Sequence, residues 1–71
     1  MARWTQKIHG PLQAHVVRLK CCALSIIGSG DWWAWTVRCS RHGARVQGKE
    51  DALHAAKAAA EQIARRLASN A

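Results

Sequence analysis

Several residue types are missing or scarce in this 71-residue chain. Phe and Tyr are absent, Pro and Met occur once each, and only four Asp and Glu accompany eleven Lys and Arg. Long apolar runs are also missing, since the segment 21–27 is far shorter than the ~20 residues that span a bilayer. The basic stretch before it is too long for a signal peptide and is interrupted by Pro11. We therefore expect a cytoplasmic protein that does not interact with membranes.

The length limits the architecture further. Residues 1–71 suffice for a single small domain, which excludes an enzyme that needs separate cofactor and substrate domains. A core of this size rarely supplies more than about 3–5 kcal/mol, so a homodimer would help stability. With 49% apolar and 21% charged residues, the composition is that of a globular chain.

The three cysteines raise the question of a metal site. Cys39-x-x-His42 has a spacing that suits two zinc ligands, and Cys21 could face Cys39 across two strands. However, the adjacent Cys21 and Cys22 would point to opposite faces of a strand, and no second ligand pair exists. An odd number of cysteines cannot pair completely. We predict reduced, buried thiols that behave as small apolar side chains, with no metal and no cofactor.

Nothing in the sequence predicts catalysis. Cys39 and His42 are three residues apart, as a nucleophile and its base could be, but no clear acid is placed to orient the histidine. The four histidines share no common spacing. We expect a protein that is not an enzyme.

Glycine, proline and their neighbours divide the chain into segments. Turn-forming residues at 9–11, 28–31, 41–43 and 48 leave four extended stretches, namely 3–8, 13–27, 32–40 and 44–47. The stretch 13–27 is rich in the Val, Ile and Leu that favour strands, and 32–40 alternates cleanly. We expect residues 1–11 to form an edge strand or an arm and residues 12–48 an antiparallel sheet.

Residues 50–68 predict a helix, because they are nearly all strong helix formers without an internal Gly or Pro. Glu50 and Asp51 would lie at its N-terminus, and Glu61 would pair with Arg65. The band of alanines leaves two readings open, namely close approach of a second helix in a dimer or helix propensity alone. One apolar stripe is expected to face the sheet: Leu53, Ala56, Ala60, Ile63, Ala64 and Leu67.

These elements predict an α+β fold, an antiparallel three- or four-stranded β-sheet packed on one C-terminal α-helix. The register chosen for the sheet keeps charged side chains away from the helix, and a slip of one residue would exchange the two faces of 13–27. Under the helix we expect Val17, Leu19, Cys21, Ala23, Ile27, Trp33, Trp35, Val37 and Cys39. On the opposite face we expect Arg18, Lys20, Leu24, Ile26, Trp32 and Arg38.

Positive charge is concentrated in the sheet half. Residues 1–48 hold seven cations and one anion, whereas residues 49–71 hold four cations and three anions. A basic sheet can contact phosphates, and an exposed tryptophan beside arginine can stack on bases or anchor an interface. Trp32 would serve this purpose unless Trp4 or the first arm covers it. The candidate binding residues are Arg18, Lys20, Trp32, Arg38, Arg41 and Arg45.

Two function classes follow from this charge. The first is a small basic module that binds DNA or RNA through its sheet, and the alternative is an inhibitory factor that docks on an acidic host protein. Arginine used only for solubility would also explain the basicity.

The segment 33–67 resembles a pattern of small phage and prophage proteins. A W-x-W-x-V strand (Trp33, Trp35, Val37) is followed by a Gly turn, a short strand ending in Gly, and an acidic start to an A-x-x-x-A helix. In outline it is also similar to the DNA-binding modules of the phage integrase arm-binding and plant AP2 type, which place three strands beside a helix. The resemblance implies a bacterial or phage origin and DNA binding, and no base-reading residue is transferred from it.

Overall fold

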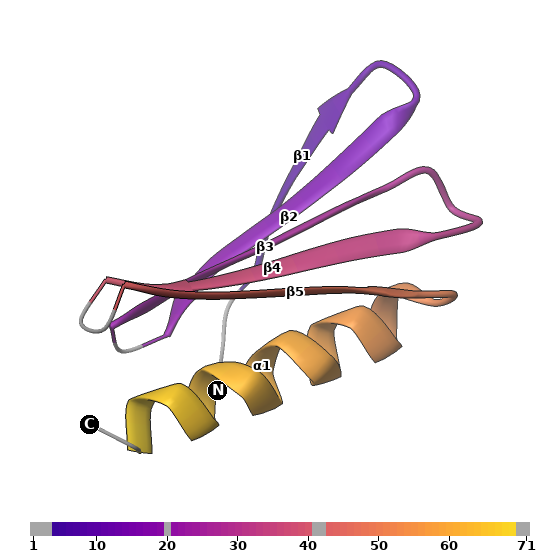
Figure 1. Cartoon of the computed structure of the whole chain (residues 1–71). Coiled ribbons are helices and arrows are strands. Elements are labelled where there is room, and N and C mark those ends of the chain that lie inside the picture. Colours follow the sequence, from indigo (N-terminus) through magenta and orange to yellow (C-terminus); the bar gives the residue numbers. More distant parts are fainter. Residues whose placement is uncertain (1–3, 20, 41–42, 70–71) are drawn as a thin grey trace.

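The computed structural model describes residues 4–19, 21–40 and 43–69. Strands adjacent in the chain are adjacent in one antiparallel sheet, and a helix follows them. Figure 1 shows this helix lying along one face of the twisted sheet. The predicted α+β class is thereby confirmed. The elements are β1 (Thr5–His9), β2 (Leu12–Leu19), β3 (Cys22–Gly28), β4 (Trp33–Cys39), β5 (Ala44–Glu50) and α1 (Leu53–Ser69).

The sheet has five strands rather than three or four, because the predicted stretch 13–27 folds back on itself. Leu19 is the pairing partner of Cys22, so the chain reverses direction between these two residues. The sequence between them contains no glycine, proline, asparagine or aspartate, the usual markers of a turn. At the start of the chain, β1 forms an edge strand, one of the two alternatives that the sequence left open.

This reversal corrects the predicted register. Leu24 pairs with Val37 and Ile26 with Trp35, so both aliphatic side chains lie under the helix instead of on the opposite face. Ala23 and Ile27, predicted under the helix, are exposed on the opposite face, and Cys21 lies in the turn before β3. Val17 and Leu19 precede the turn and have the predicted orientation. Trp33, Trp35, Val37 and Cys39 are buried as expected.

Two tryptophans of β4 lie across glycines of the neighbouring strands. Gly28 pairs with Trp33, and Gly48 pairs with Trp35. A Cβ atom at either glycine would overlap the indole ring opposite it. Glycine is therefore required at both positions, because the ring occupies the space that a side chain would need. The sequence predicted that the strand ends at Gly48, but β5 continues to Glu50.

The helix packs on β4, with β3 and β5 on either side of the contact. Ala56, Ala60 and Ala64 are fully buried against the sheet, and the larger side chains of the predicted stripe flank them half-buried. The predicted stripe is confirmed. Small side chains at the centre allow the helix backbone to approach the two tryptophans closely. The dimer suggested by the other alanines stays a prediction.

The helix begins at Leu53, so its predicted acidic first turn is wrong. Glu50 still belongs to β5, where its carboxylate accepts a hydrogen bond from Trp35 Nε1 at 3.4 Å. The predicted pair of Glu61 and Arg65 is confirmed, with Arg65 Nη2 and Glu61 Oε1 3.6 Å apart. Because the Arg65 side chain is 71% exposed, this pair contributes little to stability.

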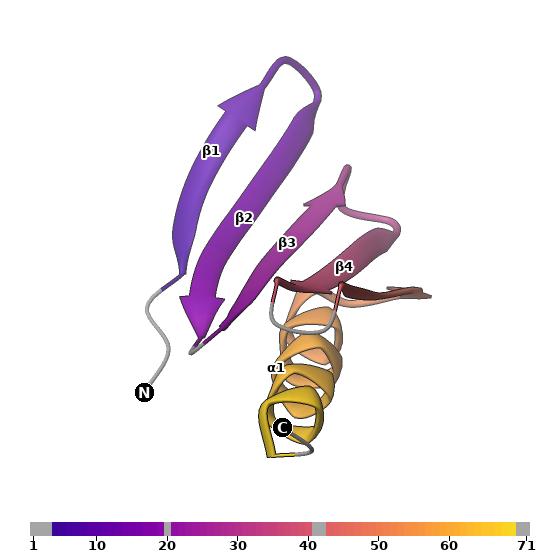
Figure 2. The same ribbon diagram turned by 60° about the vertical axis from the view of Figure 1, so that its left-hand side comes forward.

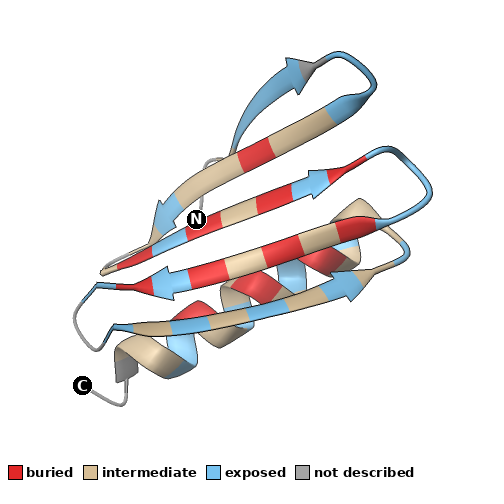
Figure 3. Ribbon diagram, turned by 45° about the horizontal axis from the view of Figure 1, so that its top comes forward, coloured by how far each residue is buried: buried red, intermediate tan, exposed pale blue. Residues whose placement is uncertain are grey.

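The β1–β2 hairpin extends away from the helix, as the turned view in Figure 2 shows. Figure 3 shows that buried residues are concentrated in β3, β4 and the helix, whereas β1 is exposed. One contact joins the start of the chain to the helix: Trp4 Nε1 donates a hydrogen bond to Glu61 Oε2 at 2.8 Å. The sheet therefore reaches beyond the helix and presents a broad surface on its other side.

Candidate functional site

We call the sheet face opposite the helix the open face, since no element of the described residues packs on it. Its side chains alternate along each strand with those under the helix, as the pairing register requires. Small and polar side chains fill its centre, and cations surround them. The open face comprises Thr5, Lys7, Leu12, Ala14, Val16, Arg18, Ala23, Ser25, Ile27, Ala34, Thr36, Arg38, Arg45, Gln47 and Lys49.

Three arginines form a row across one end of the open face. Arg18 of β2 and Arg38 of β4 both pair with Ala23 of β3, and Arg38 also pairs with Arg45 of β5. Each of the three is exposed. Since neighbouring strands are ~4.8 Å apart, the row extends over roughly 14 Å. Arg38 and Arg45 are directly opposite, an arrangement of like charges that destabilises a sheet.

Two lysines complete the positive charge toward the other end. Lys7 of β1 and Lys49 of β5 belong to one cross-strand row and stand on the two edge strands, roughly 19 Å apart. Among the described residues, the open face carries these five cations and no carboxylate. The acids lie elsewhere: Asp31 is in the β3–β4 loop, Glu50 is on the helix side, Asp51 follows β5, and Glu61 is in α1.

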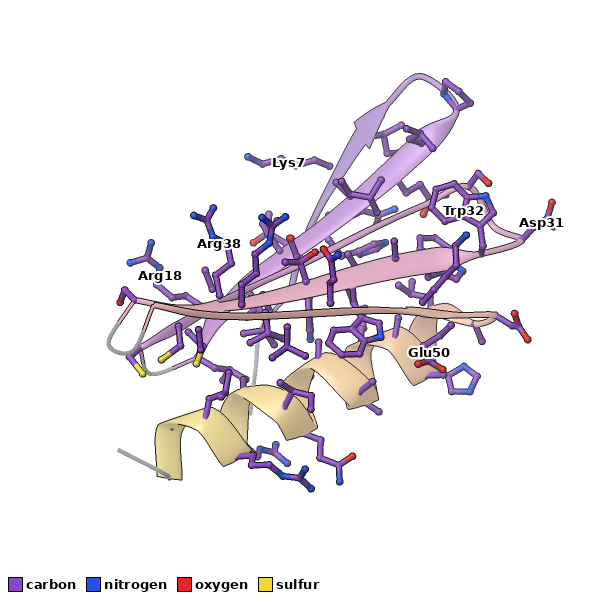
Figure 4. The ribbon with its side chains drawn as sticks, in the orientation of Figure 1. Lys7, Arg18, Asp31, Trp32, Arg38 and Glu50 are labelled. Carbon is purple, nitrogen blue, oxygen red and sulfur yellow. The ribbon has the colours of Figure 1, made fainter. Side chains whose placement is uncertain are left out.

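Trp32 lies beside Lys49 rather than beside the arginines. The residue is 37% exposed, and Lys49 Nζ lies over its ring, 5.2 Å from the ring centre. Figure 4 places Trp32 at the opposite end of the sheet from Arg18 and Arg38. Trp4 contacts the helix, so it is not the residue that covers Trp32.

Three of the six predicted site residues therefore come together, namely Arg18, Arg38 and Arg45. Trp32 is on the surface but distant from them, and Lys20 and Arg41 lie outside the described residues. The sequence reasoning missed Lys49 because Gly48 was taken as the end of its strand. The alternation of Arg45, Gln47 and Lys49 is the signal that could have located it.

Two hollows are associated with the arginine row. One, of about 470 Å³, lies on the open face and is lined in part by Thr5, Ser25, Arg18 and Arg38. The other, of about 500 Å³, lies at the end of the sheet. It is lined by the three arginines together with all three cysteines. Arg18 and Arg38 thus line both hollows.

The three thiols form a cluster, although the sequence predicted that neighbouring cysteines would point apart. Their sulfur atoms all lie within 4.8 Å of one another, and Cys21 Sγ and Cys39 Sγ are only 3.1 Å apart. The prediction was wrong because Cys21 lies in a turn, where the alternation of a strand does not apply. Burial, and then hydrogen bonding to the Cys39 and Cys21 thiols, raises the pKa of Cys22 to about 12. None of the three cysteines forms a disulfide.

His15 is a buried titratable group under the helix. Its imidazole is 5% exposed and meets the Trp33 ring edge-on, with ring centres 5.8 Å apart. Nε2 has no hydrogen-bond partner among the described residues. Burial, and then the positive charge of Lys57, lowers the pKa of His15 below its ordinary value. The neutral ring is therefore favoured. His15 is on the helix side of β2, so it is not part of the open face.

Comparisons with protein-family models, curated proteins and solved structures found no match. No helix within the described part of the chain combines the length and the apolar character needed to cross a membrane.

Proposed function

We propose that this protein binds nucleic acid through the open face of its sheet. The observation that carries the proposal is the charge of that face, on which Arg18, Arg38, Arg45, Lys7 and Lys49 occur without a carboxylate among the described residues. A polyanion would neutralise these cations together. Lys and Arg on phosphates supply most of the affinity of proteins that bind nucleic acid without sequence preference.

The arrangement of the arginines supports a polyanion rather than an internal role. None of the three pairs with a described carboxylate, and the directly opposed Arg38 and Arg45 repel each other in the free protein. An arginine fork can bind phosphate oxygens through two hydrogen bonds. A phosphate between two such forks would replace the repulsion by attraction.

The centre of the open face supports contact with a backbone. Thr5, Ser25, Thr36 and Gln47 lie in one cross-strand row next to the arginines, and side chains of these types commonly bond to phosphate and sugar. Beyond them, an unpaired base can stack on the exposed Trp32 once Lys49, whose Nζ lies over the ring in the free protein, turns toward the adjoining phosphate. A tryptophan next to a lysine favours binding of single strands, in which bases are free to stack.

The salt dependence of binding tests the proposal. Anisotropy of a labelled oligonucleotide should report affinity that falls linearly on a log–log salt plot. Five engaged cations set a limiting slope of about −3.5 for a single strand and about −4.5 for a duplex. Absence of binding to either form at micromolar concentration and low salt would refute the proposal.

Substitutions locate the surface. Arg38→Ala should reduce the magnitude of the slope by about one and weaken binding to unrelated sequences equally. Arg65→Ala is the matched control, because it removes the same charge from the helix, and it should bind like the unchanged protein. Equal losses in both variants would indicate attraction by net charge alone and would contradict a site on the open face.

A second candidate function, docking on an acidic protein, is favoured by one observation. Leu12 and Ile27 are 38% and 46% exposed on the open face, at the end away from the arginine row. Interfaces between proteins commonly surround apolar contacts with charge. This candidate predicts negligible nucleic-acid binding at physiological salt and a stoichiometric complex with an acidic protein, which Ile27→Ser weakens.

A further inference from the structure

The cluster of Cys21, Cys22 and Cys39 has a geometry that the proposed nucleic-acid binding does not use. The cluster belongs to the β2–β3 turn and to the paired ends of β3 and β4. Figure 4 shows the sulfur atoms in yellow at the same end of the sheet as Arg18 and Arg38, between the sheet and the helix. The turn, the start of β3 and the end of β4 thus each contribute one thiol to the cluster.

We propose that these three thiols bind one soft d¹⁰ metal ion, Cu(I) or Zn²⁺, as thiolates. Thiolate sulfur is the protein ligand that selects Cu(I) and Zn²⁺ over harder ions. Three thiolates can complete the coordination of Cu(I), whereas Zn²⁺ would take a fourth ligand such as water. The inference does not depend on nucleic-acid binding.

The distances between the sulfur atoms suit one shared ion. Three sulfurs each ~2.3 Å from a metal lie roughly 3.8–4.0 Å apart in trigonal or tetrahedral geometry. The observed separations include 3.1 Å between Cys21 and Cys39 and do not exceed 4.8 Å. Adjustments of less than about 1 Å would therefore bring all three to bonding distance of one metal.

Two constraints keep the cluster in place. Cys22 and Cys39 are cross-strand partners and are 0% and 1% exposed. The turn that carries Cys21 is fixed by Ser40, whose backbone N–H and hydroxyl both donate to the Cys21 carbonyl oxygen at 3.3 Å. The third ligand is therefore attached to the same strand end as the other two, which limits the entropy lost on binding.

The surroundings suit a negatively charged metal centre. Three thiolates leave a charge of −2 with Cu(I) and −1 with Zn²⁺, and the hollow beside them is lined by Arg18, Arg38 and Arg45. These guanidinium groups would balance part of the negative charge of the complex, and the metal ion has to displace the thiol protons when it binds. The three cysteines are themselves part of the lining of this hollow of about 500 Å³.

Metal titration of the reduced protein tests the proposal. The full chain, kept anaerobic with a phosphine reductant, is titrated separately with Cu(I) and with Zn²⁺ against a chromophoric chelator of each. We expect one equivalent of at least one ion, with a new sulfur-to-metal absorption in the Cu(I) arm or three sulfur neighbours by X-ray absorption in the Zn²⁺ arm. Absence of stoichiometric binding in both arms, or a shell of nitrogen and oxygen alone, would overturn it.

Cys21→Ser is the decisive variant, because Cys21 is in a turn and half-buried, so the fold should tolerate the change. It should lower metal affinity by more than about 100-fold, the upper end of what losing an outer-shell partner costs. Ala23→Ser changes another residue lining the hollow without touching a thiol, and it should bind normally. Unchanged affinity in a Cys21→Ser protein with an intact melting transition would exclude the three-thiol site.

Discussion

Two glycines of the sheet leave room for the aromatic rings that lie over them. The Trp35 ring occupies the space that a side chain at Gly48 would need, and the Trp33 ring does the same at Gly28. Four tryptophans are the only large aromatic residues of this chain, and two of them fill its core. The core thus combines very large and very small side chains.

Gly48→Ala should destabilise the fold by about 1–3 kcal/mol, because the added methyl group overlaps the Trp35 indole. Urea unfolding measures the change as a lower midpoint. Gln47→Ala, the neighbouring exposed position of β5, should stay within about 0.5 kcal/mol and serves as the control. Equal stability of the two variants would show that the indole does not need the glycine.

His15 makes stability depend on pH. Because its pKa is lowered in the folded state, the unfolded chain takes up a proton at a pH where the folded protein does not. Stability should therefore fall as the pH drops below the ordinary value of 6.5. His15→Leu should reduce this loss between about pH 7 and 5, as measured by thermal melts, whereas His54→Gln, an exposed position of α1, should retain it. Identical profiles for His15→Leu and the unchanged protein would contradict the assignment.

At the scale of elements, α1 and β4 could be predicted because each has a complete local pattern. The alanine-rich segment has helix propensity and one apolar stripe, and 33–39 alternates without interruption. The β2–β3 hairpin could not be predicted, because residues 20–21 lack turn chemistry. A missed turn also shifts the alternation by one residue, which explains the wrong faces for Leu24 and Ile26 and the unforeseen cluster of thiols.

The packing of α1 on the sheet gives a matched pair of substitutions. Ala60 is fully buried against the sheet, and Ala58 is exposed on the same helix. Ala60→Leu should lower the free energy of unfolding by about 1–3 kcal/mol through overpacking. Ala58→Leu should be nearly neutral, because leucine is also a good helix former. The thermal transitions of the two variants provide the comparison, and a neutral Ala60→Leu would contradict close helix–sheet contact.

For the molecule as a whole, the two layers differ in charge. The helix has both positive and negative side chains, namely Lys57, Arg65, Arg66 and Glu61. The charged side chains described on the open face are all positive. Five of the eight lysines and arginines that the structure describes thus lie on one side of the sheet. The sequence predicted the basic sheet half from counts alone, but the positions of Lys7 and Lys49 on the two edges required the pairing of all five strands. Such an asymmetry would steer the polyanion of the proposed function toward the open face.

The arginine side chains provide the most direct measurement of this claim. Each Nε–H group gives a nitrogen–proton NMR signal that reports on the surroundings of one guanidinium group. On titration with a short single-stranded oligonucleotide at low salt, the signals of Arg18, Arg38 and Arg45 should shift together, while those of Arg65 and Arg66 stay in place. Shifts confined to the two helix arginines, or no shifts at saturating oligonucleotide, would contradict binding through the open face.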